Sequence, residues 1–185
     1  MKIKSISNTD KHIVDEITEI HLKTFEGFFL TFMGRGFLKQ MYMSYLYHKN
    51  SNILVAVENN EVIGFLAYSS DLSGLYKDMI KKRLVSFMWY SFGAFCRKPK
   101  VFMRLLRAFL KPREASRDEK YVELTSIGVN NDAKSKGVGS QLITALKKQI
   151  DMNEYEYITL ETDAEENEIA NHFYKKKRVR FISCV

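Results

Sequence analysis

A short glycine-bearing turn is the part of the sequence best suited to binding an anion. Gly137 and Gly139 lack Cβ atoms, so a ligand can approach backbone N–H groups that have no intrahelical partner at a helix N-terminus. Lys134 and Lys136 add positive charge beside them. Because helix N-termini and lysines both favour negative charge, the turn predicts a phosphate or pyrophosphate site. The expected binding residues are Lys134, Ser135, Lys136, Gly137, Val138, Gly139 and Ser140.

The residues on either side of this turn fit a strand and a helix. Residues 121–129 are largely apolar and β-branched, which is typical of a strand in the middle of a sheet. Residues 142–150 carry apolar side chains at helical spacing. The turn does not match the P-loop, which has four residues between its glycines. It also does not match the dinucleotide-binding fingerprint, which has three glycines. A tight strand-to-helix turn with solvated lysines is the alternative interpretation.

The turn resembles motif A of the GNAT N-acetyltransferases, whose Arg/Gln-x-x-Gly-x-Gly/Ala sequence and following helix hold the pyrophosphate of acetyl-CoA. Lys134 stands at the first position of that motif, as a basic but non-consensus residue. Residues 167–174, NEIANHFY, follow the strand-like YEYITLETD with the Asn-x-x-Ala-x-x-Phe-Tyr pattern of the family's motif B. The resemblance implies an α/β fold of GNAT type, with a mixed, mostly antiparallel central sheet flanked by helices.

The same resemblance implies roles for individual side chains. Glu123 matches the position of the glutamate base in the histone-acetyltransferase branch, with Glu161 or a water molecule as alternatives. Tyr174 matches the motif-B tyrosine, which lies near the thioester sulfur and can donate a proton to the leaving thiolate. Asn167 matches the residue that usually binds the pantetheine arm, and capping of its helix is an alternative or additional role.

The family's fourth and fifth strands separate at a bulge, where backbone groups bind the pantetheine amides. We therefore expect Ile127 and Val129 to contact acetyl-CoA through their main chain, and Gly128 is compatible with the bulge. The chain departs from the family after motif B, because residues 175–179 lack the usual Gly-Phe. Residues 179–185 suffice for a sixth strand only, so we expect a sheet edge that is short, completed by another subunit of a homodimer, or lost by truncation.

The first seventy residues fit the start of such a fold in outline. We expect a strand over 2–7, a helix capped by Thr9 and Asp10, a second helix over 36–47, and a hairpin of 52–57 with 61–69 through Asn59-Asn60. The link 24–35 contains four phenylalanines, which are interpreted either as a wall of the acceptor site or as core.

Some fifty residues, at about 70–119, separate the third and fourth expected strands and form a basic helical insert. Its pattern predicts one helix over about 75–95 and a second between Pro99 and Pro112. The second would carry a basic stripe opposite an apolar one, formed by Lys100, Arg104, Arg107 and Lys111. The insert is interpreted as a lid on the sheet or, through 98–111, as a contact with an anionic membrane surface.

Composition limits the class of protein. The 185 residues suit a single domain over 1–185, and 45% hydrophobic content indicates a folded chain. Residues 72–117 carry twelve Lys and Arg against two acidic residues, although the whole chain has a net charge of only +7. Two cysteines without a framework and the lack of a signal-like segment favour a cytoplasmic protein, peripheral to the membrane if the insert binds lipid. No metal site is expected from the four histidines, and nucleic acid is not expected as a partner.

The sequence therefore predicts an acetyl-CoA-dependent N-acetyltransferase that acts on a small-molecule or peptide amine by direct transfer in a ternary complex. Two alternatives belong to other classes. One is a CoA-binding module without turnover, and the other is a basic surface-binding protein that works through its insert, with strongly salt-dependent affinity for a polyanion. The identity of the amine acceptor stays open at this point.

Overall fold

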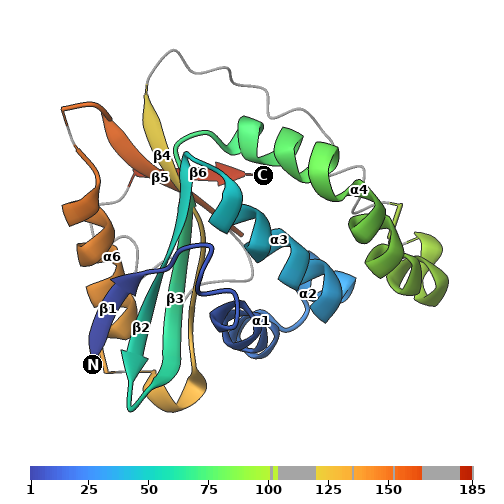
Figure 1. Ribbon diagram of the computed structural model, residues 1–185, viewed down its shortest axis with the longest axis horizontal. Helices are drawn as coiled ribbons and strands as arrows, with labels where there is room; N and C mark the ends of the chain where they lie inside the picture. Colours follow the sequence, from blue (N-terminus) through green and yellow to red (C-terminus); the bar gives the residue numbers. More distant parts are fainter. Residues whose placement is uncertain (101, 104–119, 135, 152, 164–179, 185) are drawn as a thin grey trace.

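One six-stranded sheet, in the order β1-β2-β3-β4-β5-β6, forms the centre of the computed structural model (Figure 1). The structure describes residues 1–100, 102–103, 120–134, 136–151, 153–163 and 180–184, with the backbone only at 29, 161–163 and 180–184. The pairs from β1 to β4 are antiparallel, whereas β4 with β5 and β5 with β6 are parallel. This sheet confirms the predicted mixed, mostly antiparallel GNAT-type α/β fold.

The strands are β1 Lys2–Ser5, β2 Ser51–Glu58, β3 Glu61–Ser69, β4 Tyr121–Val129, β5 Tyr157–Asp163 and β6 Arg180–Cys184. The helices are α1 Ile13–Thr24, α2 Phe29–Met33, α3 Arg35–Tyr47, α4 Leu72–Arg97 and α6 Val138–Gln149, with the 3₁₀ turn η1 Asn131–Ala133. No helix in these described ranges is long and apolar enough to cross a membrane.

Helices cover both faces of the sheet (Figure 1). Successive residues of a strand point to opposite faces, so β2 buries Leu54 and Ala56 against α6 and Ile53 and Val55 against α1 and α3. All four side chains are fully buried. The apolar run of β2 is therefore continuous because both faces of the sheet belong to the core.

The hairpin between β2 and β3 confirms the turn predicted from two asparagines. Asn59 and Asn60 have φ angles of 51° and 64°, the left-handed values that a two-residue hairpin turn of this type requires. The predicted cap of the first helix is wrong. Helix α1 begins at Ile13, and the Asp10 carboxylate instead accepts hydrogen bonds from the backbone N–H and hydroxyl of Ser7, closing the preceding turn.

The insert between β3 and β4 is helical, as predicted. It begins with α4, a 26-residue helix whose first turn is capped by the Asp71 carboxylate, which accepts from the Gly74 N–H at 2.8 Å. Helix α4 packs along α3, where the rings of Phe87 and Phe37 lie 4.8 Å apart. Residues 99, 100, 102 and 103 begin a second helix, while Arg104, Arg107 and Lys111 of the expected basic stripe lie outside the described residues.

The bulge in β4 lies at Thr125 rather than at Gly128. Ser126 pairs with Ala67 of β3, and Leu124 pairs with the next residue, Tyr68, so Thr125 is the extra residue of β4. Gly128 stands in regular register opposite Phe65. A Cβ atom there would lie 2.7 Å from Cε1 of the Phe65 ring, so packing rather than a bulge requires this glycine.

Gly128→Ala is therefore expected to lower the free energy of unfolding by about 1–3 kcal/mol, because the Phe65 ring is fully buried and must shift to admit a methyl group. Urea unfolding of the purified variant measures the change. Gly93→Ala is the matched control, since a Cβ at this position in α4 would meet no atom within 4 Å. Equal stability of the two variants would contradict this account of Gly128.

Candidate functional site

Strands β4 and β5 separate halfway along β4. Their parallel register runs from Tyr121 opposite Tyr157 to Leu124 opposite Leu160 and then ends, although β4 continues to Val129 and β5 to Asp163. Beyond Leu124, the described partner of β4 is β3 alone. The predicted separation of these strands is confirmed. A strand edge without a neighbouring strand can pair with an extended ligand that carries amide groups.

The side chains of Ile127 and Val129 pack against the core on the α6 side of the sheet. Only the main chain of these two residues is thus left to face the open edge of β4. The Val129 carbonyl accepts a hydrogen bond from the Thr24 hydroxyl at 3.4 Å, near the long limit for such a bond. This arrangement fits the expectation that both residues would contact a ligand through their backbone.

The turn after β4 leads directly into α6. Gly137 has a φ of +74°, in the left-handed region that favours glycine, and α6 begins at the next residue. The Gln141 N–H donates to the Gly137 carbonyl at 3.0 Å, so the N–H groups of Val138, Gly139 and Ser140 precede the first intrahelical hydrogen bond of this turn. They form the positive end of the helix.

Packing against β3 fixes the position of this helix end. The Val138 side chain is buried, and a Cβ atom on Gly64 would lie 2.9 Å from Cγ1 of Val138. The absence of a side chain at Gly64 therefore lets the start of α6 approach the sheet closely. Val138 therefore anchors the turn to the sheet through its side chain.

The two lysines of the turn differ in their surroundings. Both are exposed, but Nζ of Lys136 lies 3.7 Å from Oε2 of Glu58, whereas no ion pair of Lys134 occurs within the described ranges. Lys134 is therefore the better placed of the two to meet an anion. Ser135, also expected at this site, lies outside the described residues.

Glu123 lies one residue before the point where the strands separate. It is 4% exposed and stands between Ser69 of β3 and Thr159 of β5. The Thr159 hydroxyl is buried without a hydrogen-bond partner in the described part of the chain. Burial raises the pKa of Tyr45 well above its usual value, and the nearby Tyr76 and Glu123 raise it further. The carboxylate thus lies near phenols on the α3 side of the sheet.

Sequence reasoning missed two tyrosines that hold the bulge of β4 to α3. The Tyr45 hydroxyl donates to Oγ1 of Thr125 at 2.8 Å, and the Tyr42 hydroxyl donates to Oγ of Ser126 at 3.3 Å. Nδ1 of His21 lies 2.6 Å from the Tyr42 hydroxyl. The hydroxyl group of a buried tyrosine usually has a hydrogen-bond partner. Tyrosines in the apolar stripe of residues 36–47 could therefore have indicated polar contacts inside the core.

His21 should make the protein less stable in acid. Burial lowers its pKa from 6.5 to about 4, so between these values the unfolded chain binds a proton that the folded chain does not. Stability therefore falls as the pH drops through this window, by up to roughly 3 kcal/mol. Urea unfolding at pH 7 and pH 4.5 should show a smaller loss for His21→Gln than for the wild type. The exposed His12→Gln is the control, and an unchanged loss in His21→Gln would contradict the assignment.

For three other expected site residues, the structure does not describe the side chain. Tyr174 and Asn167 lie outside the described residues. Glu161, the alternative base, is described by its backbone alone and pairs with Ile182 of β6, beyond the point where β4 and β5 separate. In the described ranges, no group of three or more His, Cys, Asp or Glu residues could hold a metal ion.

Comparison with known proteins gives one family match. Residues 14–178 match the model described as the Acetyltransferase (GNAT) family. No curated protein sequence matches the chain at a significant level.

Several solved structures share the fold. One is the aminoglycoside antibiotic 6'-N-acetyltransferase AAC(6')-IG from Acinetobacter haemolyticus, with 14% identity, a TM-score of 0.60, and coverage of 100% of this chain and 94% of that chain. Another is the ribosomal-protein-alanine N-acetyltransferase from Brucella melitensis biovar Abortus 2308, with 10% identity, a TM-score of 0.55, and coverage of 97% and 91%. A V. cholerae integron cassette protein has 18% identity, a TM-score of 0.54, and coverage of 98% and 86%.

Proposed function

Because this chain belongs to the GNAT acetyltransferase family, we propose that it transfers an acetyl group from acetyl-CoA to an amine acceptor directly, in a ternary complex. The observation that carries the proposal is the end of the β4–β5 pairing at Leu124 and Leu160. It leaves five residues of β4 without a described partner on one side, and the chain then passes through η1 to the left-handed turn at Gly137.

Acetyl-CoA would bind along this edge through groups that are already in position. The pantetheine amides would pair with the backbone of Ile127 and Val129, whose side chains are held in the core. The pyrophosphate would accept hydrogen bonds from the first N–H groups of α6, and Lys134, which has no ion pair within the described ranges, would add positive charge. The motif-B pattern assigns Asn167 to the pantetheine arm as part of the same proposal.

The chemistry requires a base and an acid. The acceptor ammonium first loses a proton to the base and becomes a neutral nucleophile. Its nitrogen then attacks the thioester carbon, the carbon–sulfur bond breaks, the nitrogen releases its second proton, and the leaving thiolate gains one. Glu123 is the proposed base because it is buried beside the point of strand separation, where the thioester end of a ligand lying along β4 would come. Tyr174 is the proposed acid that protonates the leaving thiolate, an assignment that rests on the motif-B pattern.

The link between α1 and α3 is the proposed wall of the acceptor site. Phe25 packs on the core and on His21, with ring centroids 4.5 Å apart, whereas Phe28 is 39% exposed and meets Phe25 edge to face. Phe25 is thus part of the core, and Phe28 is available to a ligand. The link 24–35 therefore fits both interpretations, as core and as a wall of the acceptor site. An exposed ring here suits an acceptor with an apolar portion beside its amine.

Turnover with a panel of amines tests the proposal. Purified protein is incubated with acetyl-CoA and, separately, an aminoglycoside, a polyamine or a peptide with N-terminal alanine, and both thiol release and the acetylated product are measured. Product formation at a rate above that with heat-inactivated protein is expected for at least one class. Saturable binding of acetyl-CoA without any product would instead favour a CoA-binding module.

A further inference from the structure

The second half of α4 exposes an unusual set of large apolar side chains to solvent. Val85 is 81% exposed, Trp89 77%, Phe92 66% and Met88 64%. Soluble monomeric proteins rarely expose large contiguous apolar patches, and such patches usually mark a site of interaction with a protein, a membrane or a ligand. We define the outer face of α4 by five exposed residues, Leu84, Val85, Met88, Trp89 and Phe92; the next apolar residue, Phe95, packs instead on the Phe102 ring, with centroids 5.6 Å apart.

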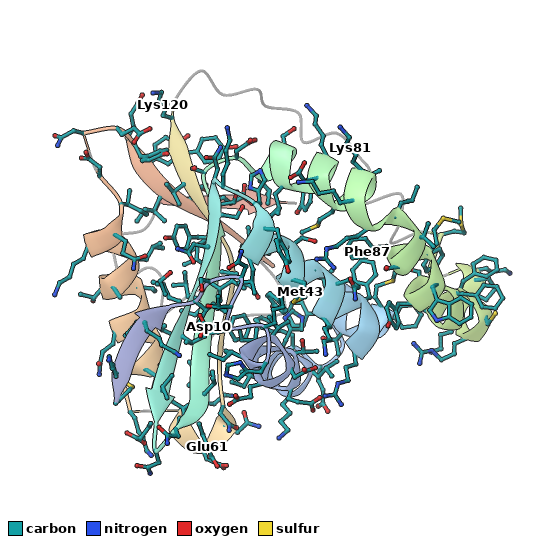
Figure 2. All side chains as sticks on the ribbon, in the orientation of Figure 1. Asp10, Met43, Glu61, Lys81, Phe87 and Lys120 are labelled. Atoms are coloured by element: carbon teal, nitrogen blue, oxygen red, sulfur yellow. The ribbon has the colours of Figure 1, made fainter. Side chains whose placement is uncertain are left out.

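The inner side of the same helix is fixed to the protein body. Phe87 packs on Phe37 of α3, and the Tyr90 ring lies directly against the backbone of Gly36. Nη2 of Arg97 donates to the carbonyl of Phe32 at 3.0 Å. Figure 2 shows Phe87 on the side of α4 that faces α3 and Lys81 on the opposite side. The outer face therefore points away from the core because the inner side is held in place.

Positively charged side chains lie on the same side of α4 as the outer face, toward the start of the helix. At helical spacing, Lys77 and Lys81 lie in line with Leu84 and Met88, and both lysines are exposed without an ion pair in the described residues. From residue 79 to residue 113 the sequence has ten Lys and Arg and no Asp or Glu. The nearest carboxylate, Asp78, already pairs with Lys82, so the surface combines aromatic and aliphatic groups with an excess of positive charge.

We propose that the outer face of α4 docks on an anionic lipid membrane, with the helix lying in the plane of the headgroups. A convex helix that presents Trp, Phe and Met beside lysines has the composition of helices at the boundary between headgroups and acyl chains. A second copy of the chain fits poorly, since a two-fold contact pairs this basic face with itself and the carboxylate beside it, Asp78, is already paired with Lys82. This surface is separate from the proposed acetyl-transfer site on β4.

Trp89 reports directly on this proposal because it is the single tryptophan of the chain. Its fluorescence in the free protein should be that of a solvent-exposed indole. Vesicles of phosphatidylcholine with phosphatidylserine should shift the emission to the blue and sediment the protein at low salt, and phosphatidylcholine alone should do so much less. Added salt should weaken the association because it screens the lysines.

Variants locate the contact on α4. Phe92→Ser with Met88→Ser should lower vesicle partitioning at least about tenfold while Trp89 remains as the reporter. Lys81→Gln should lower it about fivefold, and Lys148→Gln, which removes the same charge from α6 on the other side of the sheet, should have little effect. Circular dichroism and thermal melting verify that each variant is folded.

Three results would overturn the proposal. The first is an absence of blue shift and sedimentation with anionic vesicles at low salt. The second is an equal loss of partitioning in Lys81→Gln and Lys148→Gln, which would indicate attraction by net charge alone. The third is a buried-type Trp89 emission in the free protein together with a dimer that Phe92→Ser dissociates, which would assign the face to a second copy of the chain.

Discussion

Glu123→Gln is expected to lower kcat by roughly a hundredfold near neutral pH while leaving the Kd for acetyl-CoA almost unchanged. The substitution keeps the size of the side chain but removes a base, and a positioned base contributes on the order of a hundredfold or more. The loss should be largest at low pH, where the amine acceptor is mostly protonated and depends most on Glu123. At high pH the acceptor is already neutral, so the rates should converge.

Steady-state kinetics across a pH series measure this effect, with calorimetry for acetyl-CoA binding. Glu61→Gln is the control, because Glu61 is an exposed carboxylate at the start of β3. Since Glu123 is buried, the melting temperature of the variant must first show that it remains folded. An unchanged pH–rate profile would move the role of base to Glu161 or to a water molecule.

Gly139→Val should weaken acetyl-CoA binding by roughly a hundredfold or more. Gly139 is the second residue of α6, where a β-branched side chain would obstruct the approach of a pyrophosphate to the helix N-terminus. Gly139 is a cleaner choice than Gly137, whose left-handed φ of +74° would strain any substituted residue.

Gln141→Val is the matched control for Gly139→Val. It places the same β-branched residue in the same helical turn, at an exposed position beyond the first three N–H groups. Lys134→Ala should weaken binding less than Gly139→Val, because one exposed lysine contributes less than the set of backbone donors. If a folded Gly139→Val protein bound acetyl-CoA as tightly as Gln141→Val, the binding site would lie elsewhere.

The sequence predicted those parts of the fold that depend on local patterns. Asn59 and Asn60 indicated the hairpin because few residues tolerate the left-handed backbone of its turn. Gly137 and the apolar spacing after it indicated the start of α6. The prediction that β4 and β5 separate came from the family resemblance, and the register of the two strands confirmed it.

Features that depend on tertiary packing could not be predicted in this way. Gly128 looked like the residue of a bulge, but only the position of the Phe65 ring shows why it is glycine. Similarly, the hydroxyl groups of Tyr42 and Tyr45 reach the bulge of β4 across some eighty residues of sequence. The exposed side of α4 was also not evident, because the apolar residues of that helix occur on both its inner and outer sides.

Amide NMR of the full chain during titration with acetyl-CoA tests the central claim most directly, because it reports where the ligand lies without requiring an acceptor. We expect the largest shifts at the N–H groups of Ile127, Val129, Val138 and Gly139, with little change in the β2–β3 hairpin. Saturable shifts confined to other parts of the chain, with these four amides unchanged, would contradict it.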